Sequence, residues 1–288
     1  MEILATAAQL RQRLGHAGRI AFVPTMGNLH AGHAALMRHA RALGDTVVAS
    51  IFVNRLQFAP NEDFERYPRT FDADCAALRA AGVDVLFAPR DAEMYPAPQR
   101  FRVAPPPLAG ELEGAFRPGF FEGVCTVVLK LFNVVAPDVA VFGLKDRQQL
   151  VIVQGMVREF NLPIEVVAGE TVRDTDGLAL SSRNIYLSAR EREEAPALHG
   201  ALRDAATALS EGRSDYATME AEAADALRER GWKVDYVAIR ASSCLALPSA
   251  NSYGSDLVVL GAATLGTTRL IDNVAVADVA GDGAPQSR

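Results

Sequence analysis

Short, fully apolar runs alternate with stretches of helical periodicity along the first 170 residues of the chain. Runs of this kind are typical of strands that are buried on both faces of a sheet. Strands are predicted at 19–25, 46–53, 83–89, 139–143 and 164–169, and helices at 33–43, 72–82, 123–137 and 146–160. Because parallel strands need crossover helices, this order predicts an α/β fold with a doubly wound, Rossmann-like parallel sheet. Ligands of such sheets bind at the carboxyl ends of the strands.

The pattern changes after about residue 175. Two amphipathic helices are predicted at 188–212 and 215–231, followed by a small sheet of short strands at 233–240, 256–266 and 268–273. We therefore expect two domains, residues 1–174 and a smaller α+β C-terminal domain of residues 175–288.

Two further segments lack a regular period. The stretch 95–119 is rich in proline and glycine, which in an enzyme of this size indicates a lid or a binding loop. The tail 281–288 is expected to be disordered.

Composition narrows the class of protein. A hydrophobic content of 49% is that of a globular chain, and a net charge of −6 argues against a broad nucleic-acid surface, although a local basic pocket stays possible. Arg11, Arg13 and Arg19 interrupt the first twenty residues, and no apolar run approaches the length of a membrane span. The three cysteines form no CxxC group and are interpreted as reduced core residues. We expect a cytoplasmic protein that binds neither membrane nor nucleic acid.

The segment PTMGNLHAGH, residues 24–33, carries the clearest chemistry. A strand ends at Pro24, Gly27 permits a tight turn, and His30 and His33 lie three residues apart at the start of a helix. Two imidazoles beside the positive end of a helix dipole suit a triphosphate, and donors fixed in advance would stabilise the charge that builds up during adenylyl transfer. A chance pair of histidines or half of a metal site is the alternative. The flanking glycines and the lack of a downstream Glu or Cys favour the nucleotide.

Polar residues also follow two other predicted strands. Asn54 and Gln57 follow strand 46–53, and a neutral amide such as Gln57 can donate to a carboxylate and accept from a hydroxyl of one small ligand. Alternatively, Asn54 only caps a turn and Gln57 is solvated. After strand 139–143, Lys145 offers a point charge for phosphate and Gln149 could meet the same ligand as Gln57. Asp146 is equally compatible with a helix N-cap.

A fourth group is LALSSRN, residues 178–184. Serine hydroxyls, backbone amides and a guanidinium in one loop could clamp leaving phosphates, although a serine-rich interdomain turn would look the same. Asp72 and Asp74 could hold Mg²⁺ with the phosphates, or could simply complement the dipole of their helix.

With these four groups in this order, the chain resembles the pantoate–β-alanine ligase family, which belongs to the HxGH nucleotidyltransferases and is related in fold to class I aminoacyl-tRNA synthetases. The resemblance runs from about residue 20 to residue 273. It includes FVPTMGNLHAGH, SIFVN, RYPRT, EGAFRPG, KLFN, KDRQQL, ETVRD, LSSRN and TRLIDN.

The resemblance implies ATP-dependent condensation of (R)-pantoate with β-alanine through a pantoyl adenylate. It implies His33 as proton donor, with His30, Lys145 and Arg183 also catalytic, and Gln57 and Gln149 as ligands of pantoate and β-alanine. The implied ATP-binding residues are Met26, Gly27, Asn28, Leu29, His30, Ala31, Gly32, His33, Gly143, Leu144, Lys145, Asp146, Val172, Leu180, Ser181, Ser182 and Arg183. It further implies Mg²⁺, for which Asp74 is the candidate ligand. It also implies a homodimer, and a C-terminal domain that takes part in a lid or in the dimer.

Three positions depart from the family pattern: Arg55 replaces a proline, Leu144 an acidic residue and Phe120 a histidine. Two alternatives stay open. One is a nucleotidyltransferase that uses the same HxGH site to join a nucleotide to a phosphorylated alcohol, and it predicts pyrophosphate release without AMP. The other, which the three departures motivate, is a nucleotide-binding module that binds ATP and does not turn over.

Overall fold

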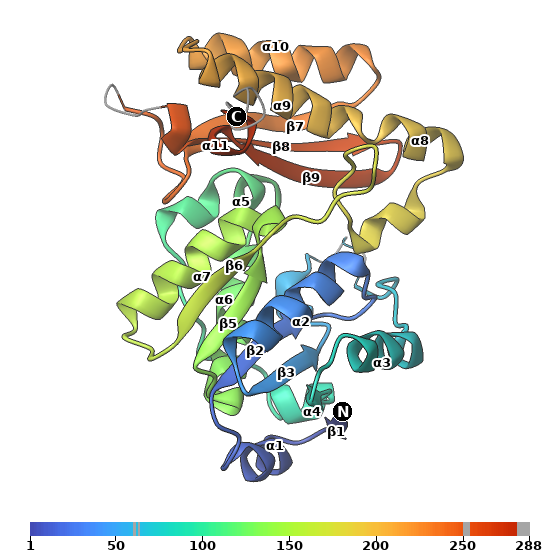
Figure 1. Ribbon diagram of the computed structural model, residues 1–288, viewed down its shortest axis with the longest axis vertical. Coiled ribbons are helices and arrows are strands. Elements are labelled where there is room, and N and C mark those ends of the chain that lie inside the picture. The colour runs from blue at the N-terminus through green and yellow to red at the C-terminus, as the bar shows by residue number, and fades with distance from the viewer. Residues whose placement is uncertain (60–61, 63, 250–253, 281–288) are drawn as a thin grey trace, which may run out of the picture. The chain divides into compact units, whose positions relative to one another are not determined.

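The computed structural model describes residues 1–59, 62, 64–249 and 254–280. The chain forms two compact units (Figure 1). The first unit comprises Met1–Leu144 and Gln148–Val172, and the second comprises Lys145–Arg147 and Arg173–Arg288. The tail predicted to be disordered, 281–288, lies outside the described residues. Within them, no helix is both long and apolar enough to span a bilayer.

The first unit is built on a six-stranded parallel sheet, as the alternating pattern predicted. Its strands are β1 (Glu2–Leu4), β2 (Ile20–Thr25), β3 (Thr46–Ile51), β4 (Val85–Phe87), β5 (Val139–Gly143) and β6 (Glu165–Gly169). The spatial order is β1-β4-β3-β2-β5-β6, and every pairing is parallel. Because the order reverses direction on either side of β2, the carboxyl ends of β2 and its two neighbours form the edge at which such sheets bind ligands.

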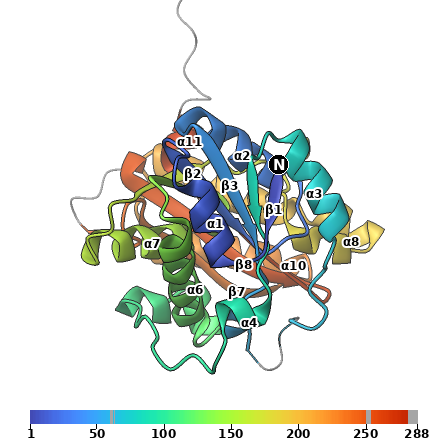
Figure 2. The ribbon, with the colours of Figure 1, turned by 90° about the horizontal axis from the view of Figure 1, so that it is seen from below.

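Helices cover both faces of this sheet, because successive strand residues point to opposite sides. Phe22 and Val48 belong to a core with α1 (Ala7–Leu14), α6 (Phe120–Val135) and α7 (Arg147–Glu159). Ala21 and Val47, one position earlier on the same strands, belong to a second core with α2 (Ala31–Leu43) and α3 (Phe71–Ala80). Figure 2 shows the two helix layers on either side of the strands. This arrangement confirms the doubly wound fold.

The stretch 95–119 contains more regular structure than predicted. After the short helix α4 (Asp91–Met94) it includes the 3-10 turn η2 (Pro107–Gly110) and the single-turn helix α5 (Glu113–Phe116). The buried amide of Gln148 ties this segment to α7: it donates to the carbonyls of Leu108 and Glu111 at 2.8 and 2.9 Å and accepts from Glu113 N at 3.0 Å. A role of the stretch as a lid stays a prediction.

The second unit packs helices on a small antiparallel sheet. The sheet has the order β7 (Lys233–Ala241), β8 (Leu257–Leu265), β9 (Thr268–Ala275), and its core includes residues of α9 (Ala197–Ser210), α10 (Tyr216–Glu229) and α11 (Val276–Ala280). The predicted α+β class is confirmed, but the predicted single helix 188–212 is wrong. It is interrupted after α8 (Ala189–Glu194), because Pro196 lacks an N–H and restricts the residue before it.

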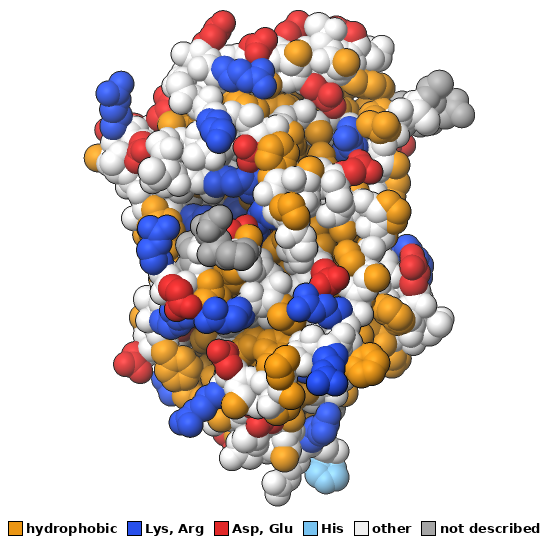
Figure 3. Space-filling view, turned by 180° about the vertical axis from the view of Figure 1, so that it is seen from behind, with side chains coloured by type: hydrophobic (Ala, Val, Ile, Leu, Met, Phe, Trp, Pro, Cys, Tyr) orange, Lys and Arg blue, Asp and Glu red, His pale blue; other side chains and the backbone are white. Residues whose placement is uncertain are grey.

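Charged side chains of both signs are interspersed on the face shown in Figure 3. Exposed side chains of opposite sign also form ion pairs in the second unit. Arg213, for example, contacts Asp215 at 2.7 Å and Glu222 at 2.6 Å. Exposed pairs of this kind contribute little to folding stability.

Candidate active site

The turn between β2 and α2 is shaped by its glycine and by one buried carboxylate. Gly27 and Asn28 both adopt positive φ, 86° and 51°. The backbone N–H groups of Asn28 and Leu29 donate to the two carboxylate oxygens of Asp74 at 3.0 and 2.8 Å, and Thr70 Oγ1 adds a third bond at 3.1 Å. Asp74, predicted as a metal ligand, is thus buried and already occupied by hydrogen bonds that hold this turn.

His30 and His33 lie together at the amino end of α2. His30 is the N-cap, its Nδ1 accepting from Gly32 N at 3.1 Å, while His33 Nδ1 accepts from His30 N at 3.3 Å. The two ring centroids are 4.1 Å apart. A neutral imidazole that accepts at Nδ1 carries its proton at Nε2. The capping bonds therefore make both rings Nε2–H donors beside the backbone N–H groups that begin the helix.

Gln57 lies at the carboxyl end of β3, on the 3-10 turn η1 (Arg55–Gln57), and is 9% exposed. Asn54 donates to its Oε1 at 3.0 Å, and Tyr95 OH donates to Asn54 Oδ1 at 2.7 Å. Its Nε2 lies 3.2 Å from Met26 Sδ. With the carbonyl taken by Asn54, Gln57 presents its NH₂ group as a donor, which suits a carboxylate. The turn-capping alternative for Asn54 is also correct, since its Oδ1 accepts from Leu56 N at 3.4 Å.

A cavity of about 280 Å³ opens within the first unit at the turn that follows β2; Gln57, His30 and His33 are not among its lining residues. Met26, Gly27 and Asp74 line it, together with Phe52 from the end of β3 and Arg90 from the end of β4. Its place at the carboxyl ends of parallel strands is that expected of a small-ligand site.

Arg117 and Glu62 support η1 and were not singled out in the sequence. Arg117 is 13% exposed, donates to Gln57 O at 3.3 Å and pairs with both oxygens of Glu62 at 2.8 and 2.7 Å. The guanidinium lies 3.7 Å from the ring centroid of Phe120. Only the motif EGAFRPG drew attention to this arginine, and its ion-pair partner Glu62 lies 55 residues away in the chain.

The three departures from the family pattern are accommodated locally. Arg55 is largely exposed, pairs with Glu65 at 2.9 Å and lies over the Phe64 ring. Phe120 packs under Arg117 and against Phe121. Leu144 packs against the core of the first unit.

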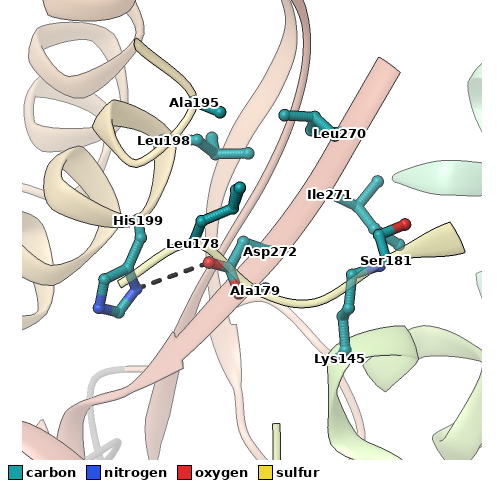
Figure 4. A pocket seen from close by; sticks show the side chains of 10 residues that line it. All are labelled: Lys145, Leu178, Ala179, Ser181, Ala195, Leu198, His199, Leu270, Ile271 and Asp272. Atoms are coloured by element: carbon teal, nitrogen blue, oxygen red, sulfur yellow. Dashed lines mark ion pairs between the residues drawn. The ribbon is translucent and has the colours of Figure 1, made fainter. Parts of the chain in front are cut away.

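The second unit brings Lys145 and Ser181 to one small cavity (Figure 4). Lys145 lies on the 3-10 turn η3 (Leu144–Asp146), and Ser181 is the N-cap of η4 (Ser182–Tyr186), accepting from Arg183 N at 3.3 Å. The enclosed space is about 10 Å³, which is the room one water molecule needs. Lys145 and Ser181 are both half-buried. The lysine ammonium and the start of this serine-rich turn are groups of the kind that bind phosphate oxygens.

Asp272 is the buried charge of this cavity. Both its oxygens accept from Arg173, at 2.6 and 2.9 Å, and His199 Nδ1 lies 3.5 Å away, as Figure 4 shows. Burial acts to raise the pKa of Asp272, but the neighbouring His199 and the hydrogen bonds and charge of Arg173 outweigh it, so the pKa lies below its ordinary value. The carboxylate is therefore charged and paired at neutral pH.

The remaining predicted residues are placed as follows. Gln149 is half-buried on α7, Gly143 ends β5, Asp146 is exposed on η3, and Val172 is the last residue of the first unit. In the described part of the chain no hydrogen bond joins Gln57 to Gln149, so their shared ligand stays a prediction.

The chain matches known proteins over nearly its whole length. A family model described as pantoate-beta-alanine ligase matches residues 2–275. A pantothenate synthetase from Nitrosomonas europaea is 57% identical over 273 residues, covering 95% of this chain and 98% of the relative, and one from Leptothrix cholodnii is 58% identical over 284 residues, covering 95% and 99%.

Solved structures agree. The crystal structure of pantothenate synthetase from Thermus thermophilus has a TM-score of 0.90 at 47% identity, covering 96% of this chain and 99% of its own. The Francisella tularensis pantoate-beta-alanine ligase, solved in complex with beta-gamma ATP and beta-alanine, has a TM-score of 0.80 at 33% identity, covering 96% and 98%.

Proposed function

The chain belongs to the pantoate-beta-alanine ligase family, and we propose that the groups described above adenylate pantoate and then pass its acyl group to β-alanine. A carboxylate is a poor acyl donor because its leaving group would be oxide. In the first step a pantoate carboxylate oxygen attacks the α-phosphorus of ATP, and the bond to the β-phosphate oxygen breaks to release pyrophosphate. In the second step the amine of β-alanine attacks the acyl carbon, loses a proton, and AMP leaves with the C–O bonding pair.

The paired histidines are the observation that supports this assignment most. Their capping bonds fix two Nε2–H donors at the positive end of α2, where extra charge on the α-phosphoryl oxygens would be stabilised. His33 is assigned as the proton donor and His30 as its neighbour. Lys145, Ser181, Ser182 and Arg183 are assigned to the phosphates that leave.

Gln57 is assigned to pantoate, with Gln149 as a second amide. The bond from Asn54 orients Gln57 as a donor, which supports recognition of a carboxylate rather than of an ammonium group. Because this amide is buried, a ligand that left it without a hydrogen-bond partner would bind more weakly, which favours specificity for a small hydroxy acid.

Mg²⁺ is assigned to the nucleotide as part of the substrate MgATP. In the parts of the chain that are described, no group of three or more His, Cys, Asp or Glu side chains could hold a metal ion, and the oxygens of Asp74 are engaged by the turn. Bound Mg²⁺ would neutralise phosphate charge.

We also propose a cytoplasmic homodimer. Cys75, Cys125 and Cys244 are free thiols, which supports a reducing compartment. Cys75 and Cys125 are buried, but Cys244 is exposed, so the prediction that it is a core residue is wrong. Light scattering coupled to size-exclusion chromatography tests the dimer, and a monomeric mass of about 31 kDa would contradict it.

The decisive assay follows pyrophosphate and AMP with MgATP and pantoate, with and without β-alanine. Pantoate-dependent pyrophosphate exchange, with AMP appearing only when the amine is added, is the expected result. Exchange that does not depend on pantoate would refute the proposal, and pyrophosphate without AMP would favour the transfer of a nucleotide to a phosphorylated alcohol.

His33→Ala tests the site itself. Loss of a donor at the transition state should slow adenylation by about a hundredfold. The control is His39→Ala on the same helix, six residues farther along, which should leave the rate unchanged. Equal rates for the two variants would remove His33 from the mechanism.

A further inference from the structure

Asp272 and Asn273 are two adjacent buried polar residues on β9, 5% and 6% exposed. Buried polar side chains need partners that repay their desolvation. Each of the two binds a different segment of the second unit, and both segments carry residues that the proposed function assigns to the phosphates.

Asn273 holds the segment of Lys145. Its Nδ2 donates to the backbone carbonyl of Lys145 at 3.1 Å, and its Oδ1 accepts from Arg147 Nη1 at 3.4 Å. Arg147 also donates to the carbonyl of Ser242 at 3.3 and 3.4 Å. One amide therefore fixes the backbone of Lys145 directly and also holds the guanidinium of Arg147, two residues farther along the chain.

Asp272 holds the segment that leads to Ser181. Arg173, which binds both oxygens of Asp272, also donates to Gly177 O at 3.1 Å and forms a β-bridge with Ala179. The hairpin of residues 173–179 is thereby attached to β9, and Ser181 follows it after one residue.

We propose that Asn273 is a positioning residue for Lys145. Asn273 itself contacts no substrate. By binding the backbone carbonyl of Lys145, it fixes the point from which the lysine side chain and its ammonium group extend. The inference rests on the proposed role of Lys145 toward the phosphates. A shift of about 1 Å in a charged group can cost about a hundredfold in rate, so the loss of this bond should appear in adenylation.

Asn273→Asp is the sharpest variant because it keeps the size of the side chain and the acceptor for Arg147. It replaces the donor to Lys145 O by an oxygen that repels that carbonyl. Adenylation, measured as pantoate-dependent pyrophosphate exchange with MgATP, should fall about 10- to 100-fold. Asn273→Ala removes the same donor without adding a charge and should show the same defect. Asn133→Asp, at an exposed position of α6, is the matched control and should be unaffected.

A double-mutant cycle with Lys145→Met separates positioning from general loss of structure. If Asn273 acts through Lys145, adding Asn273→Ala to Lys145→Met should slow adenylation no further. Losses that multiply, or a rate within twofold of wild type for both Asn273 variants, would overturn the inference. If Lys145→Met itself leaves adenylation unchanged, the assigned role of Lys145 fails instead, and with it the basis of the inference.

Discussion

Gly123 on α6 lets the helix backbone touch the turn that carries Gln57. A Cβ built at this position would lie 2.3 Å from Leu56 O and 2.6 Å from Gln57 N. The carbonyl of Gly123 also accepts from Asn54 Nδ2 at 3.1 Å, so the same close approach anchors the amide that orients Gln57. Gly123→Ala should therefore displace η1 rather than α6, because α6 is fixed by the core along most of its length.

The size of the effect follows from the overlap. Moving Leu56 O out to the shortest distance at which real Cβ contacts occur requires roughly 0.7 Å or more, and overpacking of this kind costs about 1–3 kcal/mol of folding stability. A Gln57 displaced by nearly 1 Å should lower the catalytic efficiency toward pantoate by about 10- to 100-fold. The apparent affinity for ATP should change much less, since the backbone of the turn after β2 is held by Asp74 and not by η1.

The assay is pantoate-dependent pyrophosphate exchange over a range of pantoate and ATP concentrations, with thermal unfolding measured in parallel. Gly155→Ala is the matched control: it is the same substitution within helix α7, and its Cβ would meet Arg158 Nη2 at an ordinary 3.8 Å. It should keep full activity and gain up to about 1 kcal/mol of stability. A Gly123→Ala enzyme with unchanged catalytic efficiency toward pantoate would refute the reasoning.

Two other carboxylates give predictions of a different kind. Asp74→Ala leaves the N–H groups of Asn28 and Leu29 without their acceptor. It should lower the free energy of unfolding, measured in urea, by about 2–3 kcal/mol and raise the KM for ATP. Asp72→Ala, at an exposed position of the same first turn, is the control and should change neither quantity. Asp272→Asn should cost about 2–4 kcal/mol at pH 7, because the Arg173 charge loses its buried partner. Since the folded-state pKa of Asp272 is lowered, this difference should be fully present above pH 4 and shrink as the pH falls through the folded-state pKa; a pH-independent difference would contradict the pairing.

The sheet of the first unit was predictable because burial on both faces leaves a continuous apolar run in each strand. The five predicted strands correspond to β2 through β6. β1 was not predicted because three residues are too few to show a period, and because the strand with which it pairs, β4, lies more than 80 residues away. The break at Pro196 was readable in the sequence and was missed because the helical periodicity continues on both sides of it.

The orientation of Gln57 shows where local patterns stop being informative. Its position after a buried strand identified it as a ligand candidate, but which end of the amide is presented depends on Asn54 and Tyr95. Tyr95 lies 41 residues from Asn54 and follows a different strand. A glutamine on a surface turn and a glutamine fixed as a donor have the same local sequence.

The position of Lys145 also depends on a residue far away in the sequence. In the sequence it lies between Gly143 and Gln149, and all three belong to one motif. In the structure Lys145–Arg147 belong to the second unit, while the residues on either side belong to the first. The contact that accounts for this, from Asn273 to Lys145 O, spans 128 residues, so no window around the motif contains it. The chemistry of the lysine can be inferred from its neighbours in sequence, but its position is set by a strand that none of the four chemical motifs includes.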